Sequence, residues 1–154
     1  MVNKKQRLIL EQVSRNLATF QQGAYTPFPS EGWVRTIRKA INMSLAQLAR
    51  RLQKKPPTVN DFEKREQAGT ITLQSLREIA EAMDMKLVYA IVPKSGTLDE
   101  MVNEKVALKA QEIVNRTSTT MALEDQENTK ARLLDAFAEK KIELKNEMPK
   151  FLWD

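Results

Sequence analysis

The 154-residue chain contains no cysteine and no histidine, and these two absences remove several kinds of chemistry at once. Without cysteine there are no disulfides and no thiolate nucleophiles, and without histidine there is no imidazole to bind a metal or act as a general base. The sequence also lacks a glycine-rich phosphate loop, a nucleophile elbow and a pair of carboxylates in an apolar setting. We therefore expect no catalytic residue, no metal site, no cofactor and no enzymatic activity.

Long apolar runs are missing as well. No uninterrupted apolar stretch reaches membrane-spanning length, and residues 1–7 lack the apolar core of a secretion signal. We expect no membrane contact and, by default, a cytoplasmic protein. Apolar residues make up 42% of the chain, which is ordinary for a globular protein. The length allows one domain with a substantial core, or a small domain with an appendage.

Positive charge is present, and it is concentrated in the segment Trp33–Glu66. This segment carries a net charge of +6, whereas the whole chain carries +5, so the remainder sums to about −1. Its charged residues are Arg35, Arg38, Lys39, Arg50, Arg51, Lys54, Lys55, Lys64 and Arg65 against Asp61, Glu63 and Glu66. A compact basic patch on a helical scaffold is typical of a duplex-binding surface. We predict that the chain binds double-stranded DNA.

Apolar spacing and capping residues predict a mainly α-helical chain. Leu10, Val13, Leu17 and Phe20 recur at helical spacing within residues 3–22, and residues 23–31 are predicted to be a connector. Four helices are predicted next: Trp33–Ile41, one capped by Ser44 and ending at Leu52, one opened by Pro56 and Pro57 and ended by Gly69, and one capped by Thr72.

The segment Lys86–Pro93 departs from the helical pattern, because it is rich in β-branched and aromatic residues and predicts one strand. A lone strand must pair somewhere, either with its symmetry mate in a dimer or with a short segment of the same chain such as residues 70–72.

Helices are predicted again over Leu98–Val114 and Leu123–Met148. We expect their apolar residues to pack on the N-terminal helix and complete the core or the dimer; these residues are Met101, Val102, Val106, Ile113, Leu133, Leu134, Phe137 and Leu144. The expected organisation is an N-terminal helix with connector (1–31), a DNA-binding domain with the strand (32–93) and a C-terminal helical region for dimer or partner contacts (94–154).

Residues 44–63 have the pattern of a helix-turn-helix. Ala49 supplies the small residue that two steeply crossing helices need at their contact, and apolar side chains seal the pair at Leu45, Leu48, Leu52, Val59 and Phe62. The motif resembles the Xre/Cro group of helix-turn-helix repressors. One departure is Gln53, which occupies the turn position where glycine is usual because the backbone there favours positive φ.

The second helix of the motif is predicted to enter the major groove. Asparagine can bond adenine, threonine and proline can pack on a thymine methyl group, and aspartate can accept from a cytosine amine. We predict base contacts from Pro56, Pro57, Thr58, Asn60 and Asp61, and phosphate contacts from Gln47, Lys54, Lys55, Lys64 and Arg65. The alternative is that Asn60 and Asp61 are solvated surface residues, that the two prolines only start the helix rigidly, and that each lysine is an ordinary surface charge.

Further motifs resemble the family called mobile mystery protein A. They are Asn3–Leu8, Gly32–Arg38, Gln47–Leu52, Pro57–Val59, Ala68–Leu73, Leu87–Pro93 and Met121–Gln126, which together span most of the chain. The resemblance implies an Xre-type protein encoded beside a Fic-domain partner, mobile mystery protein B, in an arrangement similar to a toxin–antitoxin pair. It also implies an antitoxin that represses its own operon. Pro56 departs from the family pattern, where glutamine is more usual.

Two segments are candidates for contact with such a partner. Thr120-Met-Ala-Leu-Glu124-Asp125 comes within one residue of the pattern of Fic inhibitory helices, although a plain helix start capped by Thr120 is the alternative. Phe151 and Trp153 near the C-terminus are candidate aromatic anchors of a protein interface. A rival hypothesis is an interaction protein that keeps the helix-turn-helix scaffold but reads little DNA. For the DNA-binding hypothesis we expect a homodimer that engages two half-sites of its own operator.

Overall fold

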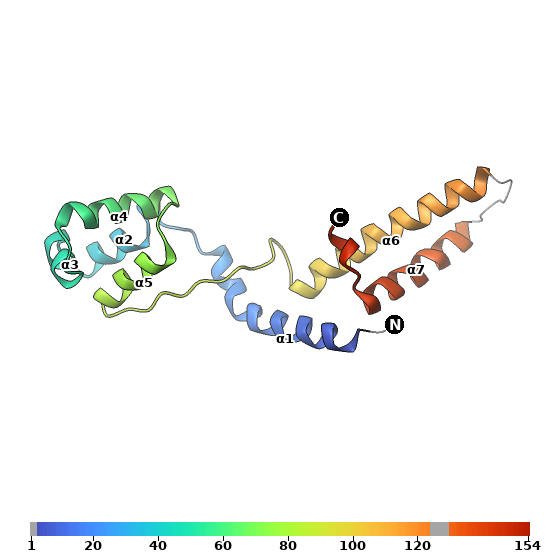
Figure 1. The fold of residues 1–154 in the computed structure, drawn as a ribbon, viewed down its shortest axis with the longest axis horizontal. Coiled ribbons are helices and arrows are strands. Elements are labelled where there is room, and N and C mark those ends of the chain that lie inside the picture. The colour runs from blue at the N-terminus through green and yellow to red at the C-terminus, as the bar shows by residue number, and fades with distance from the viewer. Residues whose placement is uncertain (1–2, 124–129) are drawn as a thin grey trace. The chain divides into compact units, whose positions relative to one another are not determined.

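The computed structural model describes residues 3–123 and 130–154, and that part of the chain is helical (Figure 1). The elements are α1 Lys4–Gln21, η1 Gln22–Tyr25, α2 Trp33–Ala40, α3 Leu45–Arg51, α4 Pro56–Ala68, α5 Leu73–Ala82, α6 Leu98–Leu123, α7 Lys130–Glu147 and η2 Lys150–Trp153, where η1 and η2 are short 3₁₀-helices. The chain divides into two compact units, residues 24–90 and residues 1–23 with 91–154. Within the described residues, no helix is long and apolar enough to cross a membrane.

The unit of residues 24–90 has its own apolar core, built by α2 to α5. The buried members are Val34, Leu48, Ala49, Val59, Ile79 and Met83. Leu45, Leu52 and Phe62 pack against this cluster, and Ala49 is only 1% exposed, which fits its predicted place at the contact between α3 and α4. The residues that the sequence assigned to the seal of the motif therefore do lie in the core.

The predicted helix starts of this unit are confirmed. The Ser44 hydroxyl accepts a hydrogen bond from the Gln47 N–H, while the Gln47 side chain accepts one from the Ser44 N–H, so that α3 begins with a capping box. Thr72 caps α5 by accepting from the Ser75 N–H. Pro56 and Pro57 occupy the first two positions of α4, where a missing N–H leaves no intrahelical bond unmade.

The turn of the motif places Gln53 in the left-handed region, as its position in the sequence predicted. Gln53 has φ of +54°, and the next N–H, that of Lys54, donates to the Ala49 carbonyl at 2.9 Å. This is the hydrogen bond of a Schellman cap. The same cap ends α4, where Gly69 has φ of +75° and the Thr70 N–H donates to the Arg65 carbonyl. The backbone at Gln53 is therefore strained because the residue has a Cβ, whereas glycine at position 69 adopts the same conformation without that cost.

Replacing Gln53 with glycine is expected to stabilise this unit. Relief of the left-handed strain exceeds the entropy that glycine adds to the unfolded chain, and we expect a net gain of about 0.5 kcal/mol. Urea denaturation of Gln53→Gly against the parent measures the gain, and Gln53→Ala serves as a matched control without it. A Gln53→Gly variant less stable than the parent would show that the turn is not strained.

The predicted strand over Lys86–Pro93 was wrong for the single chain. Residues 85–93 have no regular secondary structure and belong to no β-ladder in the described part of the structure. Residues 70–72, proposed as an alternative partner, do not pair with them either. β-branched residues favour an extended backbone, but a strand also needs a neighbouring backbone to bond, and the folded chain supplies none here.

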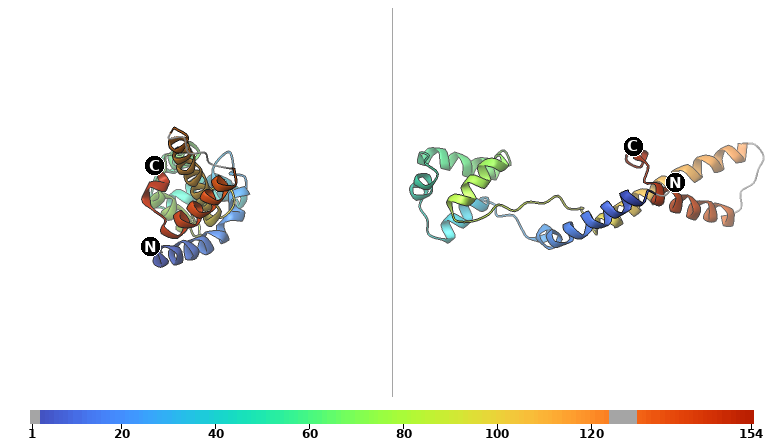
Figure 2. Two further views of the ribbon diagram at one scale, coloured as in Figure 1. Left: turned by 90° about the vertical axis from the view of Figure 1, so that its right-hand side faces the viewer. Right: turned by 60° about the horizontal axis from the view of Figure 1, so that its bottom comes forward.

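The other unit is built from α1, α6, α7 and η2. Helices α6 and α7 lie side by side as an antiparallel hairpin in all views (Figures 1 and 2). The core residues are Leu10, Val102, Val106, Ala110, Leu144 and Leu152. Leu10 of α1 thus joins the core as expected, whereas Val13, Phe20 and Leu134 are 38–60% exposed. Helix α6 runs to Leu123, well beyond the predicted end at Val114, and α7 is described from Lys130 onward.

A polar cluster ties the start of α6 to the end of α7. Lys145 Nζ lies 2.6 Å from an oxygen of Asp99 and 2.5 Å from the side-chain oxygen of Asn103. The hydrogen bond from Lys145 lowers the pKa of Asp99 below its usual value, against a smaller opposing effect of burial. Since the lowered pKa belongs to the folded chain, this contact stabilises the hairpin above the ordinary pKa of aspartate and is lost as the pH falls through the lowered one.

One of the two candidate partner segments differs from the expectation. Thr120 does not cap a helix start; it lies near the end of α6, and its hydroxyl donates to the Arg116 carbonyl one turn back at 3.1 Å. The sequence could not show this because α6 continues further than its apolar spacing indicated. Glu124 and Asp125 of the same pattern lie outside the described residues. At the C-terminus, Phe151 and Trp153 are exposed on either side of the buried Leu152.

Candidate nucleic-acid interface

Helix α4 has one face in the core and the opposite face in solvent. Val59, Glu63 and Glu66 lie on the buried face. The residues at positions 57, 60, 61 and 64 follow helical spacing on the other side, so they form a single outward face. This face carries four of the residues predicted to contact DNA. α4 is the second helix of the motif, the one that enters the major groove in such folds.

An ion pair in the interior holds α4 against α2. The Arg38 guanidinium donates to both oxygens of Glu63, at 2.6 and 3.2 Å, and to the Met43 carbonyl at 3.0 Å. The Glu63 side chain is 2% exposed and that of Arg38 is 12% exposed. Such a two-point contact fixes orientation as well as distance, so it sets the position of α4 on its support.

A second carboxylate from α4 caps the start of α2. The two oxygens of Glu66 accept from the N–H groups of Trp33 and Val34, each at 2.9 Å. The negative charge lies at the positive end of the helix dipole. Gly32 lets the backbone pass close to this carboxylate: it has φ of +83°, and a Cβ there would stand 2.8 Å from a Glu66 oxygen. Any larger residue at position 32 would displace the cap.

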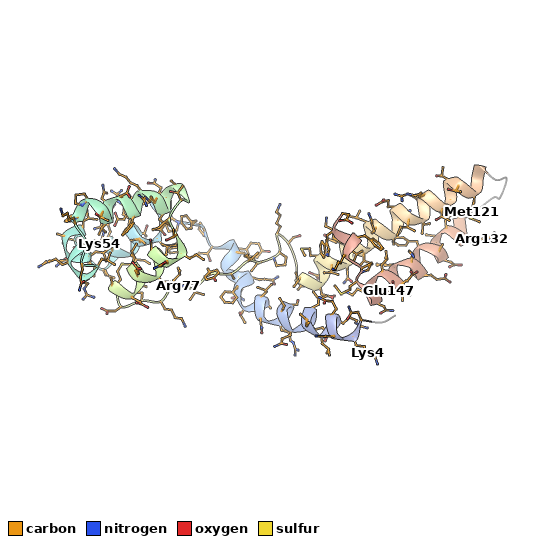
Figure 3. All side chains as sticks on the ribbon, viewed as in Figure 1. Lys4, Lys54, Arg77, Met121, Arg132 and Glu147 are labelled. Carbon is orange, nitrogen blue, oxygen red and sulfur yellow. The ribbon has the colours of Figure 1, made fainter. Side chains whose placement is uncertain are left out.

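These two contacts change the charge that the motif presents to solvent. Two of the three acids of Trp33–Glu66 are internal, which leaves Asp61 as the acid that this segment exposes in the structure. In contrast, the side chains of Arg50, Lys54, Lys55 and Lys64 are exposed and make no ion pair within the described part of the chain. Figure 3 labels Lys54, which lies in the turn between α3 and α4. The outer surface is therefore more basic than the sequence count indicates.

The predicted base-contact residues differ in their exposure and in whether their polar atoms already have a partner. Pro56 and Pro57 are exposed, and Thr58 and Asn60 are half-buried. Among the residues that the structure describes, the side chains of Thr58 and Asn60 have no hydrogen-bond partner, so their polar atoms are available to a base edge. Asp61 is engaged: its carboxylate lies 2.8 Å from Arg65 Nε. This pair screens the aspartate from phosphate and holds Arg65, which was predicted to bind phosphate.

Gln47 and Arg50 form a polar edge on α3. The Gln47 side-chain oxygen accepts from the Ser44 N–H at 2.7 Å, which directs its amide N–H₂ away from the cap. Arg50 follows one turn later on the same side, and both residues line a shallow groove of about 500 Å³ with Ile41, Asn42, Met43 and Arg51. Arg50 was not among the predicted contacts, although its spacing from Gln47 was a usable signal. Arg51 is less available because it pairs with Asp84 at 2.9 Å.

The start of α4 itself offers few donors to an anion. Pro56 and Pro57 have no N–H, and the N–H groups of Thr58 and Val59 both donate to the Lys55 carbonyl, at 3.0 and 3.3 Å. Helix N-termini often bind phosphate through free N–H groups. Here the side chains of Lys54 and Lys55 carry the positive charge at that position instead, which is a more flexible and longer-reaching arrangement.

Comparison with known proteins agrees with this geometry. Residues 34–89 match the model of a helix-turn-helix family, a range that covers α2 from its second residue, α3 to α5 and part of the irregular segment that follows. No curated protein and no solved structure gives a significant match. The resemblance to mobile mystery protein A, which involves both ends of the chain, stays a prediction. Residues 34–89 form a helix-turn-helix domain of the Xre/Cro type, which confirms the predicted motif and indicates DNA binding in a regulatory role.

Proposed function

We propose that the protein is a sequence-specific transcriptional repressor that binds its own operator as a two-fold dimer. The observation that carries the proposal is the outward face of α4, where Asn60 has a free side chain and Lys64 a free charge. One helix with few base-reading side chains gives little affinity alone. Two copies that engage half-sites about one helical turn apart supply more contacts and match a palindromic operator.

The residues of this face divide into two roles. Thr58 and Asn60, with the two prolines, face the base edges and supply sequence preference. Lys54, Lys55 and Lys64, with Gln47 and Arg50 from α3, contact phosphate and supply affinity that does not depend on sequence. Asp61 and Arg65 can join either set only if their mutual ion pair opens.

Asn60→Ala is expected to relax sequence preference at one base position of each half-site. The loss of a two-point contact to adenine costs about 1–3 kcal/mol on the preferred sequence and little on others. Fluorescence anisotropy on duplexes with each base pair varied in turn measures this. Gln74→Ala is the control, because it removes an amide side chain from the exposed face of α5. If Asn60→Ala weakened all duplexes equally, Asn60 would not be reading a base.

A second candidate role is neutralisation of a Fic-domain partner by direct contact, as the resemblance to mobile mystery protein A implies. The supporting observation is the C-terminal tail. Phe151 and Trp153 are 43% and 55% exposed, while Leu152 between them is 4% exposed and anchors the tail in the core. Exposed aromatic residues on an anchored turn are well placed to enter a partner.

Phe151→Ser with Trp153→Ser is expected to abolish co-purification with the Fic-domain partner and to leave DNA binding unchanged. Substitution is preferable to deletion of the tail, because deletion also removes Leu152 from the core. Leu108→Ser, at another exposed apolar position of the same unit, is the matched control. Undiminished recovery of the partner with the double variant would exclude the tail from recognition.

A further inference from the structure

The segment Met85–Pro93 exposes apolar side chains, and in the part of the chain that the structure describes its backbone is unpaired from residue 86 onward. Val88, Tyr89 and Ile91 are 62%, 58% and 86% exposed. No backbone N–H or C=O of residues 86–93 takes part in a backbone–backbone hydrogen bond within the described residues. Residues of this type are rarely left in solvent in an extended run, because the free edge is a template for another backbone. The segment therefore has the composition of a strand but, in the described structure, no backbone to pair with.

The ends of the segment limit the ladder that it can form. The Met85 N–H is already used, since it donates to the Ala80 carbonyl at 2.8 Å, and Pro93 has no N–H. The free donors therefore run from residue 86 to residue 92. Tyr89 is the midpoint of this run.

We propose that this segment pairs antiparallel with the same segment of a second copy, with Tyr89 opposite Tyr89. The inference rests on the proposed dimeric repressor and specifies its dimer interface, which is called the seam below. A two-fold axis perpendicular to the sheet keeps each side chain on its own face, so one residue must lie opposite its own copy. The register therefore reduces to a choice of the central residue.

The ends of the segment and the charged residues that would face each other favour Tyr89 as the central residue. With Tyr89 central, Met85 lies opposite Pro93, so the two positions without a free donor meet at each end of the ladder. Lys94 then comes next to Asp84, a turn residue with φ of +58° whose side chain is 83% exposed and open to a second cation. With Ala90 central, Lys86 would face Lys94 twice, which is unfavourable. With Val88 central, Pro93 would lie opposite Met83, the C-cap of α5.

The surroundings of the segment fit a strand that is completed by its own copy. Leu87, Val88, Tyr89 and Ala90 line an apolar groove of about 720 Å³ with residues of α2 and α5 such as Trp33 and Leu76. The Arg77 guanidinium lies 6.0 Å from the centre of the Tyr89 ring, a cation–π distance; Figure 3 labels Arg77 on α5. The central residue is thus partly ordered before pairing, which lowers the entropy lost on association.

The absence of cysteine makes the register directly measurable, because each introduced cysteine is the protein's sole thiol. In the proposed pairing, the Cα atoms of Tyr89 in the two copies lie about 5 Å apart, so a cysteine at this position is within the range of a disulfide. Leu87 lies opposite Ile91 of the other copy, so the two copies of Leu87 are about 13 Å apart along the strand and cysteines there cannot join. A mixture of Leu87→Cys and Ile91→Cys proteins can.

The experiment is oxidation by diamide of Tyr89→Cys, Leu87→Cys, Ile91→Cys and the mixture, with one mixed protein tagged to change its mass. We expect covalent dimers from Tyr89→Cys and from the mixture, and monomers from Leu87→Cys and Ile91→Cys alone. Monomers in all four samples, or equal crosslinking in all four, would overturn the register. If the protein were still dimeric and still bound two half-sites, the proposed function would stand and only this seam would fall.

A charged residue at position 89 tests the same interface without a crosslinking reaction. Tyr89→Glu places two carboxylates opposite each other, and we expect light scattering to give a dimer dissociation constant raised at least about tenfold. Tyr25→Glu, at an 80% exposed tyrosine of the same unit, is the matched control and should leave the dimer unchanged. An unchanged dimer in Tyr89→Glu would contradict the proposal even if Tyr89→Cys failed to fold.

Discussion

Arg38→Met is expected to destabilise the unit of residues 24–90 by about 3 kcal/mol, because it leaves the Glu63 carboxylate without its cation and an unpaired charge in the interior is costly. The Glu63 side chain is only 2% exposed. The substitution also frees the Met43 carbonyl, which Arg38 bonds at 3.0 Å. Since Trp33 and Trp153 lie in different units, a Trp153→Phe background leaves Trp33 as the reporter of this unit in urea denaturation.

Two variants separate the buried charge from other causes. Arg38→Met with Glu63→Met removes both charges and should recover most of the lost stability, because an apolar pair of similar size can replace a buried ion pair. Asp61→Ala breaks the exposed pair with Arg65 on the same helix and should cost less than about 1 kcal/mol. A double variant as unstable as Arg38→Met would mean that the pair is not the cause.

Lys55→Glu with Lys64→Glu is expected to reduce affinity for every duplex by at least about tenfold and to flatten the salt dependence. Each phosphate contact contributes about 0.9 to the slope of log K against log salt, so the loss of two should reduce the slope by about 2. Anisotropy titrations at several salt concentrations on specific and unrelated duplexes measure both effects.

The matched control for this pair is Lys141→Glu with Lys150→Glu, which makes the same change in net charge on exposed residues of the other unit. It should leave the slope unchanged, because neither lysine lies on the outward face of α4 and neither contacts phosphate in the proposed complex. Equal losses in the two double variants would indicate an effect of net charge alone and would contradict the placement of the interface on α4.

The helices of the DNA-binding unit could be predicted because their signals are local. Ser44 with Gln47, Thr72 and Gly69 mark ends through groups only a few residues away, and the structure uses each as a cap. The positive φ at Gln53 was predictable for the same reason. Helix α6 was harder to predict. Its apolar pattern weakens beyond Val114, where the predicted helix ended, but no glycine or proline follows to stop it, and the helix continues to Leu123.

What the sequence could not show depends on distant contacts. Glu63 and Glu66 entered the sequence analysis only through the net charge of the segment, yet they bond Arg38, Trp33 and Val34, which are 25 to 33 residues away. Spacing along one helix does not reveal such partners. The segment 86–93 illustrates the same limit, because β propensity describes a backbone preference while a strand requires a neighbour. Four of the candidate DNA contacts share a face of α4 by helical spacing, and the i, i+4 spacing of Asp61 and Arg65 was a usable local signal for the ion pair that occupies both.

The measurement that tests the central claim most directly is fluorescence anisotropy of the unmodified protein. The probes are a labelled duplex of its own upstream DNA and a scrambled duplex of the same composition, at several salt concentrations. We predict binding to the upstream duplex at least about a thousandfold tighter than to the scrambled one, with strong salt dependence for both. Equal affinity for the two duplexes, or no binding to either at low salt, would contradict a sequence-specific DNA-binding protein.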